Sequence, residues 1–413
     1  MTRGWRGLAG LSGASVLQAA ANAVAGLLAT RALGPSERGL MVLGLTIASV
    51  YGLIGGLGSG AAFRSRLPAA SGGLRRSLVS AFTWCSVGGA AVAVASAVAT
   101  TAVSSAWIDP SLATPGLLAA TGAVTVGQVL LTQVPDAWFA DGRFRRGGLA
   151  AAGVSAGGLT GVALGLVFAD SAATVLLAQA AGMVLAGAAE VGALHRAGLA
   201  RLGRPEPGPI RALLRRGTPA LGLTVGLVMA LRADRYFLGV AGGAAAVGVY
   251  SLAATLAEIG RLLPAAVGQL YLRDTSTGAG AARFPSATKL AVLSAAAAGL
   301  VVAPAAWLLI VPVFGPDFGS ARTLVVVLAV AEICLAPYSV AGRGLLGGGW
   351  TGLAGTLGVI GSLAALVIYL AAAQWAGSYG VAAGSVVVYA GLSTAAAGLL
   401  RRRLRTGVAI ERS

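Results

Sequence analysis

Long apolar stretches, separated by short polar segments, follow one another along the whole chain. Each stretch has roughly 20 residues or more, the length that a helix needs to cross a bilayer. No polar segment is long enough to form a soluble domain. The pattern predicts an all-α polytopic membrane protein with about twelve membrane-spanning helices, near residues 7–32, 39–62, 77–103, 113–139, 148–169, 172–195, 217–239, 244–272, 288–312, 321–346, 352–373 and 379–400.

Arginine residues are concentrated in alternate loops between these helices. Positive residues are retained on the cytoplasmic side of a membrane. The alternation therefore predicts an even number of spans, with both termini in the cytoplasm. The arginine-rich loops include residues 64–76, 143–146, 196–216 and 401–405.

One hydrophobic hairpin occurs twice. Gly39 and Gly248 are 209 positions apart (248 − 39), and Arg64 and Arg273 have the same separation (273 − 64). Repeated halves in a membrane protein are typical of transporters with two lobes around a shared cavity. The repeat predicts an N-terminal six-helix lobe over residues 1–196, a cytoplasmic linker over 197–216 and a C-terminal six-helix lobe over 217–413.

Composition narrows the function classes. Of the 413 residues, 57% are hydrophobic and 10% are charged, and the formal net charge is +17. The topological bias of arginine accounts for this charge, so we expect contact with membrane lipids and none with nucleic acid. The two cysteines and the single histidine predict no metal site and no cofactor. The triplet at Gly347 has no following lysine of a phosphate loop, and we expect no enzyme activity.

Several charged residues fall inside the apolar stretches. Glu258 and Arg261 lie near the middle of the eighth span, three residues apart, so they share a face and can pair. Charges at this depth cost at least about 2.5–3.5 kcal/mol each and need a partner or a wet cavity. A buried ion pair and a substrate cavity are both compatible with this pattern. The other charges at depth are Glu332, Arg232, Asp234 and Arg235, of which the last three could also be interfacial anchors.

Two positions are candidates for gating. Pro264 follows the charged pair by one turn and should bend the eighth helix, because proline lacks a backbone donor. Gly56 lies on a glycine face of the second span, which we expect to pack tightly or to let the helix slide. The fifth span has a similar face, with glycines every four residues from Gly153 to Gly165.

Four short motifs resemble those of polysaccharide transporter flippases, which export O-antigen, capsule and teichoic-acid units. These flippases belong to the multidrug/oligosaccharidyl-lipid/polysaccharide superfamily. The stretch from Arg31 through Leu33-Gly34-Pro35 to Gly39 is similar to the entry of their second helix. The matches in the second half are Asp234-Arg235 with Leu238-Gly239, Gly248-Val249-Tyr250-Ser251, and Phe314-Gly315-Pro316-Asp317-Phe318.

The resemblance implies a V-shaped, two-lobed transporter in the bacterial cytoplasmic membrane. Such proteins alternate between inward- and outward-open states and carry lipid-linked sugars, with a cationic cavity for the diphosphate-sugar headgroup. Only Arg31, Asp234, Arg235 and Tyr250 transfer as motif positions. The chain departs from lipid II flippases, which usually have further C-terminal spans. Its only lysine is Lys289, so arginine would have to contact the diphosphate.

Three hypotheses for the function follow. The first is a flippase for a lipid-linked oligosaccharide or polysaccharide precursor, with a polysaccharide polymerase or glycosyltransferases as protein partners. The second is a cation-coupled small-molecule antiporter of the same superfamily. The third is a membrane component of a polysaccharide assembly locus without transport activity. For either transporter, H⁺ or Na⁺ bound at Asp234, Glu258 or Glu332 would be a possible coupling ion.

Overall fold

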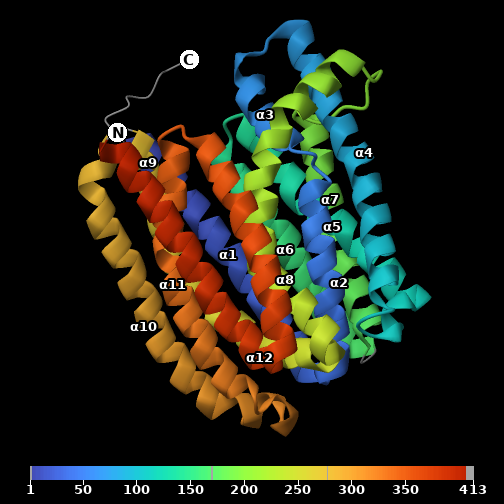
Figure 1. The fold of residues 1–413 in the computed structure, drawn as a ribbon. Helices are drawn as coiled ribbons and strands as arrows, with labels where there is room; N and C mark the ends of the chain where they lie inside the picture. Colours follow the sequence, from blue (N-terminus) through green and yellow to red (C-terminus); the bar gives the residue numbers. More distant parts are fainter. Residues whose placement is uncertain (1, 169–170, 277, 406–413) are drawn as a thin grey trace. The chain divides into compact units, whose positions relative to one another are not determined.

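The computed structural model describes residues 2–168, 171–276 and 278–405, and every regular element in these ranges is helical. The chain divides into two compact units, Met1–Leu221 and Gly222–Ser413. Figure 1 shows the helices coloured along the sequence. The all-α prediction is confirmed.

The first unit is arranged around α5 (Pro115–Ala140), which packs against α2, α4, α6 and α7. Helix α1 lies along α6. A sequence rich in small residues allows these close helix contacts. The other helices of the unit are α1 (Thr2–Ala32), α2 (Pro35–Ile54), α3 (Ser59–Arg66), η1 (Leu67–Ala69), α4 (Gly72–Ser104), η2 (Pro110–Ala113), α6 (Phe144–Phe168), α7 (Ala172–Arg196) and the first turns of α8 (Pro207–Ala257).

The second unit is arranged around α11 (Ala321–Gly347), which packs against α9, α10 and α12. In Figure 1 these helices run beside one another in yellow to red. The remaining elements are the rest of α8, η3 (Glu258–Arg261), α9 (Leu262–Ser276), α10 (Gly280–Phe314), η4 (Pro316–Phe318) and α12 (Thr351–Arg405).

Nine helical segments within the described ranges are long and apolar enough to cross a membrane. Two of them, Thr224–Ser276 and Thr351–Arg405, are long enough for two crossings each. Both are divided by non-helical residues, at Gly243 in α8 and at Ala376 and Gly377 in α12. These breaks lie between the spans that the sequence predicted, at 240–243 and 374–378. The chain is therefore a multi-pass membrane protein, while the count of twelve spans stays a prediction.

The second span is interrupted, although the sequence predicted one continuous helix over 39–62. Helix α2 ends at Ile54 and α3 begins at Ser59. Between them, Leu57 and Gly58 have positive φ angles of 48° and 71°. The Gly58 backbone lies directly against that of Gly217, so there is no room for a side chain at either position.

The eighth span changes from α-helix to a 3₁₀ turn shortly before Pro264. The short 3₁₀ segment η3 separates α8 from α9. Pro264 has no N–H to donate to the carbonyl of Gly260, four residues earlier. Glu258 and Arg261 thus lie in a 3₁₀ turn, and the bend at Pro264 stays a prediction.

The range 197–216 is partly helical, because α8 begins at Pro207. The preceding extended segment is held against α4 by three hydrogen bonds. The Arg201 amide donates to Thr83 Oγ1 (3.2 Å), Trp84 Nε1 donates to the Gly203 carbonyl (2.8 Å), and Ser77 Oγ donates to Glu206 Oε2 (2.6 Å). This segment is thus an ordered part of the first unit.

The glycine face of the fifth span lies against α7. A side chain at Gly157, Gly161 or Gly165 would collide with Ala178, Gly182 or neighbouring α7 residues. Gly153 faces open space. The glycines therefore allow close backbone approach between α6 and α7.

Candidate functional site: an intramembrane charge cluster

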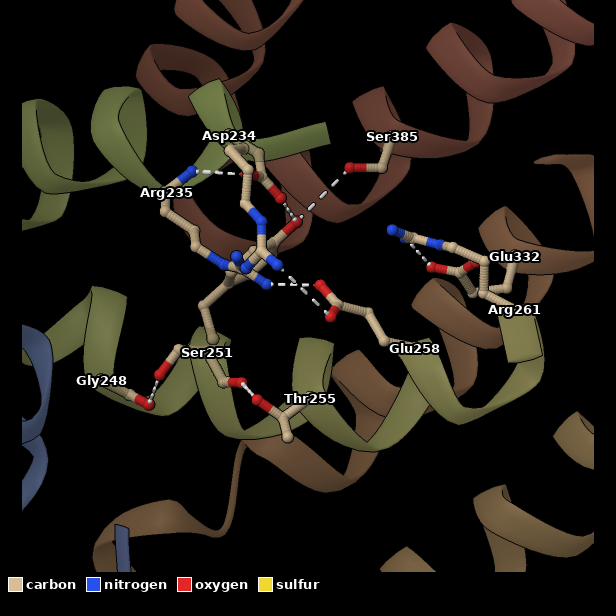
Figure 2. Close-up of polar contacts among 11 residues, drawn as sticks. Asp234, Arg235, Gly248, Ser251, Thr255, Glu258, Arg261, Glu332 and Ser385 are labelled. Atoms are coloured by element: carbon tan, nitrogen blue, oxygen red, sulfur yellow. Dashed lines mark hydrogen bonds and ion pairs between the residues drawn. The ribbon is translucent and has the colours of Figure 1, made fainter. Parts of the chain in front are cut away.

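The charged residues that the sequence placed at membrane depth in the second half form one cluster within the second unit. They come from α8, η3 and α11, and Figure 2 shows how they face one another. Since long apolar segments surround them, these groups must satisfy one another or face water. The cluster contains Arg232, Asp234, Arg235, Glu258, Arg261 and Glu332.

Glu258 is the acceptor for two arginines of α8. Its Oε1 lies 2.7 Å from Arg235 Nη2, and its Oε2 lies 3.9 Å from Arg232 Nη2. The Arg235 side chain is only 4% exposed, whereas that of Arg232 is 40% exposed. Arg235 is therefore tightly paired with Glu258, whereas Arg232 pairs weakly and keeps a partly exposed side chain.

Arg261 pairs with Glu332 on α11. Its Nε donates to Glu332 Oε2 over 2.9 Å, and its Nη2 donates to Oε1. This two-point contact holds the guanidinium in a fixed plane. The Glu258–Arg261 pair that the spacing allowed does not form, because Glu258 pairs with Arg235 on α8 and Arg261 pairs with Glu332 on α11 (Figure 2).

Asp234 is buried and bonded to neutral donors rather than to an arginine side chain. Its Oδ1 accepts the Arg235 backbone N–H (2.8 Å), and its Oδ2 accepts the Tyr250 hydroxyl (2.8 Å). Tyr250 also lies 3.4 Å from Ser385 Oγ on α12. The two motif residues Asp234 and Tyr250 are thus brought together from either side of the break at Gly243.

Other polar groups of this region were missed from the sequence. Ser385, Tyr369 and Tyr389 lie on α12 and are buried. The Tyr369 hydroxyl donates to the Ala230 carbonyl (3.0 Å). Buried tyrosines need such partners, but nothing in the apolar stretches of α12 identifies which helix provides them.

The cluster is formally neutral, with three arginines and three carboxylates. The resemblance implied a cationic cavity, and these six residues alone do not provide a net positive charge. Arg235 Nε is buried without a hydrogen-bond partner. Within the cluster, Arg232 is the arginine with the most exposed side chain.

Arg31 and Gly56 belong to the first unit. Arg31 is exposed in the last turn of α1. Gly56 is buried, and a Cβ at this position would overlap the side-chain amide of Gln133 on α5. The neighbouring glycines behave alike, because a Cβ at Gly52 would meet Gln128 and one at Gly60 would meet Asp136. The glycine face of the second span therefore accommodates the polar side chains of α5.

No group of three or more potential metal-ligating His, Cys, Asp or Glu side chains occurs in the described part of the chain. Both cysteines, Cys85 and Cys334, are free thiols.

Solved structures with the same arrangement of helices are membrane transporters. A multidrug resistance MATE family transporter of the MOP superfamily, in an inward-facing conformation, is similar over 95% of this chain and 96% of its own, with a TM-score of 0.73 and 17% identity. The lipid II flippase MurJ, in an inward closed conformation, is similar over 95% of this chain and 87% of its own, with a TM-score of 0.79 and 12% identity. This chain has the MATE/MurJ fold.

An outward-facing MATE family transporter also matches, over 97% of this chain and 96% of its own, with a TM-score of 0.65 and 16% identity. The MATE/MurJ fold thus accounts for nearly the whole chain. No protein-family model matches the sequence. No curated protein matches it either.

Proposed function

We propose that this chain is a transporter that moves a lipid-linked oligosaccharide or polysaccharide precursor across the bacterial cytoplasmic membrane by alternating access. Both termini would lie in the cytoplasm, and residues 1–196 and 217–413 would act as the two moving lobes. Similarity to both MurJ and MATE transporters supports the transport class. The flippase assignment rests on the charge cluster.

The observation that carries the assignment is the accessible guanidinium of Arg232. It lies 3.9 Å from Glu258, at the outer limit of an ion pair, and 40% of its side chain is exposed. A guanidinium matches the geometry of phosphate oxygens. A substrate diphosphate could take over this contact while Arg235 retains Glu258 and Arg261 retains Glu332.

The test is transport in proteoliposomes. Purified protein is reconstituted with a fluorescent undecaprenyl-diphosphate-linked oligosaccharide, and a membrane-impermeant quencher reports its movement between leaflets. We expect transport by the native chain and about tenfold slower transport by Arg232→Gln, since a charge-assisted hydrogen bond contributes about 1.5–3 kcal/mol.

The matched control is Arg283→Gln. Arg283 pairs with Asp274 over 2.7 Å, outside the cluster, and its side chain is 63% exposed. This variant should transport at the native rate. Equal rates for Arg232→Gln and the native chain would remove Arg232 from the site, and a native chain unable to move the glycolipid would reject the flippase assignment.

A second candidate is a cation-coupled antiporter for small molecules. The neutral cluster favours it, because three carboxylates at membrane depth suit a coupling H⁺ or Na⁺ as well as three arginines suit a phosphate. MATE transporters share the fold. Proton or sodium flux driven by an organic cation in the same vesicles, without glycolipid movement, would select this function.

A third candidate, a non-transporting component of a polysaccharide assembly locus, predicts neither activity. Copurification with a polysaccharide polymerase or a glycosyltransferase, without flux in vesicles, would favour it.

A further inference from the structure

A groove of about 640 Å³ lies along the first turns of α8, within the first unit, whereas the charge cluster belongs to the second. Its lining combines two charged and several apolar side chains. They are mainly Pro205, Pro207, Ile210, Arg211, Leu214 and Arg215.

The residues that carry the groove are fixed by contacts with α4 and with the hydrophobic core of the first unit. On its N-terminal side, the segment before Pro207 is bonded to α4 through Thr83, Trp84 and Ser77. On the helix itself, Leu213 is fully buried in a hydrophobic core with Leu199, and Ile210 packs against this core. These contacts fix the orientation of the α8 face that carries the groove.

Charge on this face is strongly positive. Arg211 and Arg215 are both exposed and are one helical turn apart, so their guanidinium groups extend from the same face. Between residues 197 and 218 there are five arginines and one acidic residue, Glu206. The Glu206 carboxylate accepts a hydrogen bond from Ser77, which directs it to α4.

We propose that this groove binds the phosphate of an anionic membrane phospholipid. Arg211 and Arg215 would hold the phosphate, and Ile210 and Leu214 would contact the glycerol and the first methylenes. A membrane lipid is the occupant that the surroundings favour, because the groove lies where a basic segment enters the apolar part of α8. Basic sites of this kind next to membrane helices recognise anionic headgroups. The site is independent of the transported substrate.

The experiment uses the full chain, purified in a mild detergent with lipid removed and titrated with phosphatidylglycerol. Native mass spectrometry counts the bound lipid molecules, and phosphatidylcholine serves as the uncharged comparison. The variant Arg211→Gln/Arg215→Gln should bind phosphatidylglycerol about thirtyfold more weakly, because each arginine near a phosphate contributes about 1 kcal/mol.

The control variant, Arg201→Gln/Arg204→Gln, removes the same charge from the same segment but leaves the two groove arginines in place. It should retain phosphatidylglycerol within about twofold of the native chain. Thermal unfolding of each variant checks that the fold is kept. Equal losses from both double variants, or equal binding of phosphatidylcholine, would overturn the site, whereas competition by free inorganic phosphate at millimolar concentration would reject a lipid in favour of a soluble anion.

Discussion

Both copies of the repeated hairpin depart from a regular α-helix in their first span, but the contacts there differ. The first copy uses glycines and the second uses charged side chains. With the offset of 209 residues, Arg261 corresponds to Gly52, and Pro264 corresponds to Gly55. In the first copy, Gly52 leaves room for Gln128 on α5. In the second copy, Arg261 extends to Glu332 on α11. Equivalent spans therefore pack against each other in both copies, but the side chains at the contact differ.

The difference shows how one framework can support two roles. The first copy brings helices together by removing side chains, so its contacts depend on shape. The second copy brings helices together through ion pairs, whose partners are accessible to different degrees. Shape-dependent contacts should tolerate no added volume, and buried ion pairs should tolerate no single loss of charge.

The largest expected effect is that of Arg261→Ala on stability. Glu332 is 5% exposed, and removal of its partner leaves a buried carboxylate unpaired. We expect the free energy of unfolding to fall by about 3–5 kcal/mol, as measured by equilibrium unfolding in mixed micelles. The double variant Arg261→Met/Glu332→Leu should recover most of this loss. A double variant as unstable as the single one would show that the ion pair is not the cause.

Next in size is Gly56→Leu in the first copy. The new side chain would collide with Gln133, and overpacking of this kind lowers stability by about 3 kcal/mol. Gln133→Ala in the same chain should restore part of the loss. The matched control is Gly153→Ala, which faces open space and should change stability by at most about 1 kcal/mol, in the favourable direction. If Gly56→Leu unfolds like the native chain, the close-packed description of the first copy is wrong.

A smaller effect is expected for Tyr250→Phe. This variant removes the hydroxyl that donates to Asp234 over 2.8 Å and keeps the ring in place. The loss should be about 1.5 kcal/mol, the lower end for a hydrogen bond to a charged group. Ser385→Ala, which removes a longer 3.4 Å contact, should cost less. A larger loss from Ser385→Ala than from Tyr250→Phe would contradict this order.

The smallest effect on stability is that of Arg232→Gln. A long, partly exposed ion pair contributes little, about 1 kcal/mol, and Arg232 lies 3.9 Å from Glu258 with 40% of its side chain exposed. Unfolding should therefore be nearly unchanged while glycolipid transport falls. A loss of stability comparable to that of Arg261→Ala would mean that Arg232 is a structural residue. The proposed difference between a partly exposed Arg232 and a firmly paired Arg261 would then be wrong.

The sequence predicted the helical class, and it singled out the charged residues inside apolar stretches that form the cluster, because hydrophobic length and charge are local properties. It also placed Asp234 and Tyr250 through motif positions. It did not predict the partners of Glu258 and Arg261, because Arg235 and Glu332, which bind them, lie 23 and 71 positions away in the sequence.

The break in the second span had a signal that could have been used. Gly55-Gly56-Leu57-Gly58 is a cluster of helix-breaking residues within an apolar stretch. The four-residue spacing of Gly52, Gly56 and Gly60 predicted instead a glycine face on one continuous helix. The close approach of Gly58 to Gly217 joins residues far apart along the chain, and no local pattern contains that information.

The 3₁₀ segment η3 also brings one negative and one positive group of two different ion pairs next to each other. In a 3₁₀-helix, residues three positions apart are aligned along the axis, so Glu258 and Arg261 attract each other even though each is bonded elsewhere. Exchanging the signs of the Arg261–Glu332 pair would keep one ion pair intact and place two carboxylates above each other at positions 258 and 261. The sign of the charge at position 261 is therefore linked to the sign at position 258. A variant that exchanges the charges of one ion pair should also exchange those of the other.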